Sequence, residues 1–170
     1  MPNADNSITT EVSRLLTAAS HVLAGARASW LITAGEEDAV NVRPMGGLRA
    51  VRPGSWKMLY LADARSRKAA DIRRAGQSTV VVQHGDDAFV SVAGLAALLE
   101  EASEVRKHWI SGYDRYFPTE QDRVNAVLIE LDVRRMDLWI RGVTPEPFGL
   151  RSTRLAQDAD GEWQIRSQPC

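Results

Sequence analysis

Apolar and polar positions follow a helical period at the start of the chain and a strand period over most of the remainder. Between Ser7 and Arg27, apolar residues recur every three or four positions, which predicts an amphipathic helix. Further along, short apolar runs alternate with polar residues between turn-forming stretches, which predicts strands. The predicted strands cover residues 29–33, 39–45, 56–62, 79–83, 89–99, 127–133 and 136–140, followed by a hairpin of 150–156 and 163–166.

Two shorter helices are expected between the strands. One covers 66–75, with Ser66 as its N-cap and a glycine directly after it. The other covers 103–111, with Ser103 as its cap, and is followed by a loop over 112–122. Many strands with few helices favour a mainly β fold, a closed antiparallel β-barrel with peripheral helices. A doubly wound α/β fold is less well supported, because its glycine-rich strand-to-helix fingerprint is missing.

Length and composition fit one soluble domain of 170 residues. Within it, residues 1–28 carry the N-terminal helix and 143–170 form a C-terminal extension with the last predicted hairpin. The net charge of −1 gives no reason to expect nucleic acid or an anionic membrane as a partner. The only cysteine, Cys170, cannot form an intramolecular disulfide, and no signal peptide or membrane-spanning run is apparent. We therefore expect a cytoplasmic protein.

Candidate chemistry begins with a basic cluster where a predicted strand runs into the helix at 66–75. Arg65, Arg67 and Lys68 surround the N-cap Ser66. Cations are unfavourable at a helix N-terminus, where free N–H groups already carry partial positive charge. An external phosphate would reverse this balance. Taken alone, however, the cluster also fits a solvated basic turn.

A second candidate is Arg43, which lies on a strand that Pro44 must end or place at a sheet edge. A guanidinium there can hold a phosphate through two parallel hydrogen bonds, although taken alone it also fits an ordinary surface arginine. Together, the two basic stretches can converge on one phosphate. Met45, Leu61 and Ala62 lie close by in sequence and offer an apolar wall, so a phosphorylated heteroaromatic ligand suits both halves of the site.

Several short motifs, in their order along the chain, resemble the FMN-binding pattern of the pyridoxamine 5′-phosphate oxidase superfamily. The resemblance extends over roughly residues 10–150, and the loop motifs are similar to the general-stress-protein branch of FMN-binding split barrels. The motifs that carry the resemblance are residues 43–45, 60–63, 66–68, 90–94, 106–109, 116–118 and 137–139.

The resemblance implies a split-barrel homodimer with FMN in clefts at the subunit interface. The phosphate ligands that it implies are Arg43, Ser66, Arg67 and Lys68. The residues that it places around the ribityl chain and the isoalloxazine ring are Pro44, Met45, Leu61, Ala62 and Phe89, with Trp139 from the partner subunit.

The chain departs from the family pattern in three places. Ala62 replaces a threonine, and Phe89 stands where the oxidase has a glutamine near the ring. The arginine and histidine that hold the vitamer substrate of the oxidase are missing after Trp139. We therefore do not expect pyridoxamine-phosphate oxidase activity itself. The expected function is that of an FMN-dependent oxidoreductase with an unknown small-molecule substrate. The alternatives are a stress protein that sequesters FMN without turnover and a binder of deazaflavin or haem.

No catalytic acid or base can be named from the sequence. The three histidines are far apart, and the only cysteine is the last residue, so a zinc site is not expected.

Overall fold

A computed structural model of the chain describes residues 4–46, 49–50 and 55–166. Cys170 lies outside the described residues. The described part has a mainly antiparallel β fold with few helices, which confirms the predicted fold class. The strands are β1 (Ser29–Ala34), β2 (Val40–Met45), β3 (Arg49–Ala50), β4 (Lys57–Asp63), β5 (Gln77–Gln83), β6 (Ala88–Leu99), β7 (Ala126–Ile140), β8 (Thr153–Gln157) and β9 (Trp163–Arg166). The helices are α1 (Ala4–Gly25), α2 (Arg67–Ala75), α3 (Ala102–Lys107) and α4 (Glu120–Val124), with a 3-10 helix, η1, at Ser111–Tyr113.

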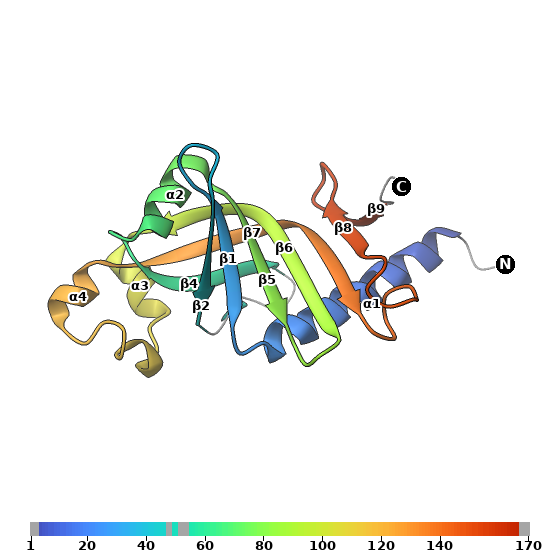
Figure 1. The fold of residues 1–170 in the computed structure, drawn as a ribbon, viewed down its shortest axis with the longest axis horizontal. Coiled ribbons are helices and arrows are strands. Elements are labelled where there is room, and N and C mark those ends of the chain that lie inside the picture. Colours follow the sequence, from blue (N-terminus) through green and yellow to red (C-terminus); the bar gives the residue numbers. More distant parts are fainter. Residues whose placement is uncertain (1–3, 47–48, 51–54, 167–170) are drawn as a thin grey trace.

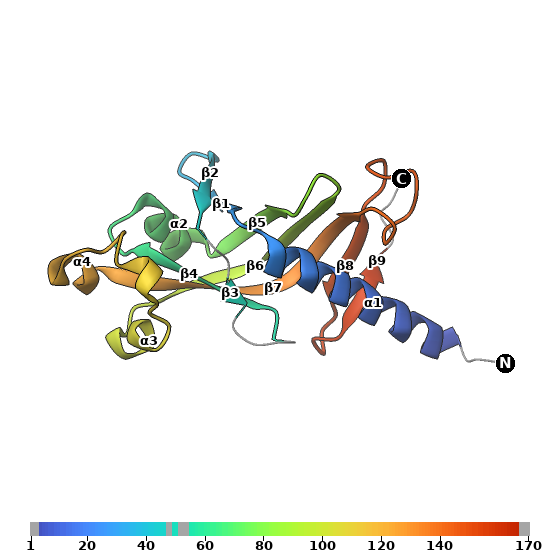
Figure 2. The same cartoon turned by 90° about the horizontal axis from the view of Figure 1, so that it is seen from below.

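The strands form one sheet in the order β2-β1-β5-β6-β7-β4-β3, and the β8–β9 hairpin extends it from β7. β2 is an edge strand of this path, as the proline within it requires. The short helices α2, α3 and α4 gather at one end of the sheet, while α1 runs towards the other end (Figures 1 and 2). This arrangement gives the sheet two chemically different ends, which determines where a site can form.

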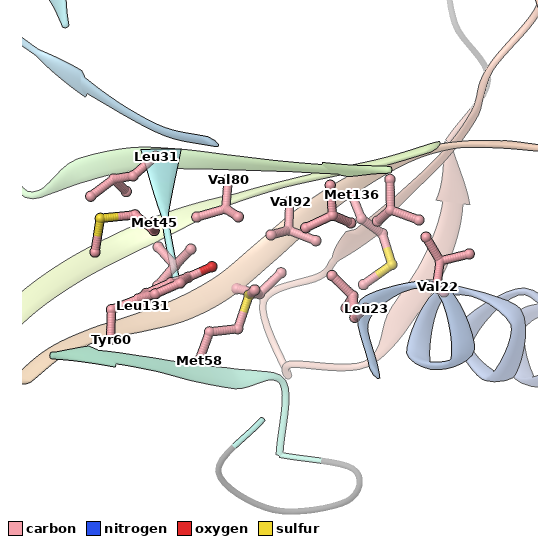
Figure 3. Close-up of a cluster of buried hydrophobic side chains, with 14 of the residues drawn as sticks. Val22, Leu23, Leu31, Met45, Met58, Tyr60, Val80, Val92, Leu131 and Met136 are labelled. Carbon is pink, nitrogen blue, oxygen red and sulfur yellow. The ribbon is translucent and has the colours of Figure 1, made fainter. Parts of the chain in front are cut away.

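The core lies between the curved sheet and α1. Val22 and Leu23 of α1 face methionines and branched residues of the central strands (Figure 3). Many of these side chains are fully buried: Leu31, Val80, Val92, Leu131 and Met136 are not accessible to solvent at all. The alternating burial of β5 follows from its antiparallel setting, because one face packs on the core and the other faces outward. The site described below is therefore built on a rigid sheet.

A β-bulge bends the long β6–β7 ladder. The register between the two strands shifts between Ala93 and Gly94, and Arg134 is the unpaired extra residue on β7. A Cβ added at Gly94 would lie 1.9 Å from the carbonyl oxygen of Asp132, so only glycine fits there. The bulge explains why Arg134 and Arg135 are both exposed although they are neighbours in a strand.

Three sequence predictions need correction. The segments 127–133 and 136–140 are one continuous strand, β7, since the bulge mimics a break in the alternating pattern. The helix predicted over 103–111 is the shorter α3, and its N-cap is Glu101 rather than Ser103, because the chain turns helical two residues earlier. The predicted 112–122 loop contains most of η1 and the start of α4, which begins with a capping box between Thr119 and Asp122.

Candidate functional site

The start of α2 has the features of an anion-binding helix terminus. Ser66 caps it: its hydroxyl donates to the carbonyl oxygen of Asp63 (2.6 Å) and accepts from the N–H of Ala69 (3.4 Å). The first turn holds no acidic residue and instead begins with Arg67 and Lys68. The partial positive charge of the helix N-terminus is thus reinforced by cations, an arrangement that favours a bound anion.

The cations of this cluster have different surroundings. Arg65 is exposed and is paired to Asp63 through two hydrogen bonds of 3.0 and 2.7 Å, which also lower the pKa of Asp63. Arg67 is exposed, whereas Lys68 is half-buried. Of the three cations, Lys68 is the one that lines the pocket described below.

Arg43 lies beside α2, as the sequence prediction requires. Its guanidinium donates to the hydroxyl of Thr33 (2.9 Å) and to the carboxylate of Asp71 (3.1 Å), one turn beyond Lys68 on α2. Asp71 also accepts from Thr33 (2.7 Å) and from the side chain of Asn41 (3.0 Å). This network joins β1, β2 and α2, and it fixes an arginine from one basic stretch next to the helix of the other.

Lys68 is the least compensated charge of the site. Its pKa is lowered from the usual lysine value, first by burial and then by the positive charge of Arg43, while Asp63 opposes the shift. Among the described residues, no carboxylate forms a salt bridge with the Lys68 ammonium within 4.0 Å. Two neighbouring cations in a partly desolvated position raise each other's energy, and a phosphate between them relieves that repulsion.

An open pocket of about 840 Å³ lies against Lys68, large enough for a cofactor-sized ligand. The sequence-predicted site residues that line it are Pro44, Met45, Leu61, Ala62 and Lys68. Ser66 and Arg67 adjoin it at the start of α2, and Arg43 approaches α2 through Asp71. The apolar residues in this lining offer a surface for a planar ring system.

The segment from Ile110 to Phe117 forms the remaining wall of the pocket. Arg115 stacks on the ring of Tyr116, with its guanidinium carbon 4.5 Å from the ring centroid. Phe117 is buried against Trp109, whose ring lies 5.9 Å away. For this segment, the sequence predicted a helix end at 110–111 and a loop from 112, with 116–118 as one motif of the family resemblance. Its aromatic content was the available signal, but nothing local in the sequence places it across from α2.

Phe89 and Trp139 do not reach this pocket in the same chain. They pair with each other across β6 and β7, whereas Leu61, which lines the pocket, pairs with Leu128 of β7. Trp139 and Leu128 are eleven residues apart on one strand, roughly 35 Å at about 3.3 Å per residue. Phe89 instead lines a second pocket of about 670 Å³ with Trp30 and His84.

The outward side of β1 and β2 is an exposed apolar surface. Alternation along both strands places three cross-strand pairs on it: Trp30 with Pro44, Ile32 with Val42, and Ala34 with Val40. Trp30 is 48% exposed, Val42 57% and Val40 69%. We call these six residues the outer apolar face. An exposed apolar surface of this kind is a candidate interaction site.

Other kinds of site find little support in the described part of the chain. No group of three or more described metal-binding side chains comes together. The described helices include none that is long and apolar enough to cross a bilayer.

Comparison with known proteins finds a family whose model matches most of the chain. Residues 17–145 match the family model described as pyridoxamine 5′-phosphate oxidase like. No curated protein sequence matches the chain.

Solved structures with low sequence identity share its fold. General stress protein 26 from Bacillus anthracis str. Sterne is 21% identical, with a TM-score of 0.62 over 74% of this chain and 93% of its own. A pyridoxamine 5′-phosphate oxidase-related, FMN-binding protein from Nostoc punctiforme PCC 73102 is 16% identical, with a TM-score of 0.63 over 99% and 98%. PhzG from Burkholderia lata 383, in complex with tetrahydrophenazine-1-carboxylic acid, is 18% identical, with a TM-score of 0.63 over 99% and 97%.

Proposed function

Since this chain belongs to the pyridoxamine 5′-phosphate oxidase-like family, we propose that it binds FMN in the pocket beside α2 and acts as an FMN-dependent oxidoreductase. The observation that carries this proposal is the half-buried ammonium of Lys68 next to Arg43, without a carboxylate of its own among the described residues. A terminal phosphate supplies the missing negative charge. The similarity to an FMN-binding protein from Nostoc punctiforme adds support.

The phosphate end of FMN is assigned to the basic groups around α2. The phosphate contacts the free N–H groups of the first turn and the side chains of Ser66, Arg67 and Lys68. Arg43 contributes its charge from β2. The ribityl chain and the ring then extend along the apolar wall, whose residues in this assignment are Pro44, Met45, Leu61 and Ala62.

A second copy of the chain completes the site in this proposal. Phe89 and Trp139 lie far along the sheet from Lys68, so they approach a ring bound near α2 only from another subunit. The outer apolar face offers a surface for pairing, because Trp30, Val40 and Val42 are exposed in the single chain. A two-fold interface uses the same patch on both subunits and creates two equivalent sites. We therefore propose a homodimer that holds two FMN molecules.

FMN and the protein have different roles in the proposed activity. FMN supplies the electron transfer when it is bound, and the protein's residues bind it, orient it and exclude water from it. Lys68 and the start of α2 hold the anionic end, and the segment 110–117 encloses the pocket from the opposite side. Arg115 and Tyr116 give this segment a polar margin at which a small substrate or electron donor can enter.

The test is a titration of the flavin-free protein with FMN and with riboflavin, which lacks the phosphate. We expect quenching of flavin fluorescence with a clear preference for FMN, and a sedimentation coefficient of a dimer. Equal affinity for both flavins contradicts the phosphate assignment. Addition of NADH or NADPH under anaerobic conditions then measures bleaching of the flavin absorbance. Bound FMN that is neither reduced nor reoxidised favours a sequestering protein over an oxidoreductase.

A further inference from the structure

Asp71 is a buried carboxylate in the middle of the basic cluster. It is 7% exposed, and its oxygens lie 3.1 Å from a guanidinium nitrogen of Arg43 and 3.6 Å from one of Arg74. Lys68 lies one turn earlier on the same helix. The neutral donors Thr33 and Asn41 complete its surroundings at 2.7 and 3.0 Å. The carboxylate thus has cations on several sides and no need for an external partner.

The balance of charge around Asp71 changes when an anion enters the pocket. In the ligand-free protein, Asp71 is the negative charge that offsets Arg43, and the charge of Arg43 in turn acts on Lys68. A phosphate beside Lys68 brings a second negative group into the same cluster. Two anions that share the same cations in a partly desolvated position repel each other. Asp71 and the phosphate therefore compete for the same cations.

We propose that Asp71 is the resident counter-ion of the anion site, which stabilises Arg43 in the ligand-free protein and weakens the binding of a phosphate group there. The proposal rests on the proposed function for the identity of the ligand, a phosphate monoester. It gives Asp71 a role that differs from simple positioning. A positioning carboxylate makes phosphate binding tighter, whereas a counter-ion makes it weaker and exchangeable.

The decisive variant is D71N, which keeps the size of the side chain and an oxygen that accepts hydrogen bonds. Calorimetric titration with inorganic phosphate in a phosphate-free buffer measures the anion site without any flavin. We expect D71N to bind phosphate about tenfold more tightly than wild type at low salt, with the difference shrinking as KCl is added. We also expect 10 mM phosphate to raise the melting temperature of D71N more than that of wild type.

Two matched variants separate charge from packing. T33V removes a neutral partner of Asp71 and Arg43 without changing the charge, so it should not tighten phosphate binding. E130Q removes a carboxylate from a different ion pair, 2.8 Å from Lys57 on β4, and should leave phosphate binding unchanged. Tighter binding in T33V or E130Q to the extent seen in D71N overturns the charge argument. Weaker or unchanged binding in D71N shows a positioning or purely structural role and overturns the proposal.

If D71N is too unstable to purify, the same comparison can be made in a variant that already lacks Arg43. Arg43→Met combined with Asp71→Asn removes the ion pair as a whole, so no buried charge is left without its partner. The counter-ion role predicts that this double variant binds phosphate more tightly than Arg43→Met alone, and equal or weaker binding refutes it. FMN titrations distinguish the two proposals. Phosphate binding without FMN binding contradicts the proposed function only, and binding of neither contradicts both.

Discussion

Replacement of Lys68 by methionine should raise the stability of the ligand-free protein and lower its affinity for FMN. Methionine keeps the apolar length of the side chain and removes only the ammonium. In the ligand-free protein that ammonium is held near Arg43 in a half-buried position, and its pKa is lowered by burial and by Arg43. A lysine with a lowered folded-state pKa binds fewer protons in the folded than in the unfolded chain. The free energy of unfolding therefore rises with pH between the two pKa values, so the charged form destabilises the fold at neutral pH.

The size of both effects follows from typical energies. Loss of the unfavourable charge should stabilise the ligand-free K68M variant by up to about 1 kcal/mol, or roughly 2–4 °C in melting temperature. Loss of one charged contact to the FMN phosphate should cost about 1.5–3 kcal/mol, a roughly 10- to 150-fold weaker affinity. Riboflavin affinity should stay the same because riboflavin has no phosphate. As the pH is raised, wild-type FMN affinity should begin to fall before the pH reaches the ordinary lysine pKa of about 10.4, because Lys68 loses its proton early. K68M should not show this fall.

The assay combines differential scanning fluorimetry without ligand with fluorescence titrations by FMN and riboflavin from pH 6 to 10. K57M is the matched control, because Lys57 pairs with Glu130 at 2.8 Å and does not line the pocket. If K68M binds FMN as tightly as wild type, or if riboflavin affinity falls by the same factor, the phosphate does not bind at Lys68 and the argument from its charge is wrong.

Three further variants test the interface, the bulge and the ion network. V42D introduces a charge on the outer apolar face and should give a monomer with at least about tenfold weaker FMN binding. V124D, on a valine of α4 that is even more exposed, should remain dimeric in sedimentation velocity. G94A should lower the free energy of unfolding by about 3 kcal/mol or more in urea denaturation, since the new Cβ meets the carbonyl oxygen of Asp132; a change within 0.5 kcal/mol contradicts the bulge geometry. The pKa of Asp71 is lowered by hydrogen bonds from Thr33, Asn41 and Arg43 that outweigh burial, so its stabilising effect is present above the unfolded pKa near 3.9 and is lost as the pH falls through the folded value. D71N should therefore be less stable than wild type at pH 7, and the difference should shrink as the pH falls below the unfolded pKa; a constant difference across this range excludes the carboxylate as its source.

Local patterns were sufficient where a short stretch of chain decides its own structure. The cap and stop signals of α2, Ser66 and Gly76, were read directly from the sequence, because capping depends on residues within one turn. Errors arose where a long-range feature altered a local pattern. The bulge opposite Gly94 placed two exposed arginines side by side and made one strand look like two.

The ordered motifs also identified the family, which the match over residues 17–145 confirms. They could do so because the short motifs of the family pattern have a fixed order in the chain. The proximity of Arg43 to α2 was inferred from chemistry alone, and the structure shows the contact through Asp71. Neither Asp71 nor Thr33 was recognised in the sequence, since a single aspartate in a helix and a threonine in a strand carry no local signal of their role.

The sequence by itself determined most of the strands, the α2 cap and the family, because each is encoded in neighbouring residues or in their order. Only the tertiary structure decided that Lys68 is half-buried beside Arg43, that Asp71 pairs with Arg43, and that the segment 110–117 lines the pocket. It also decided that Phe89 and Trp139 lie at the far end of the sheet from Lys68. The physical reason is that burial, charge balance and strand register depend on contacts between residues that are distant in sequence. These contacts exist only once the sheet has formed.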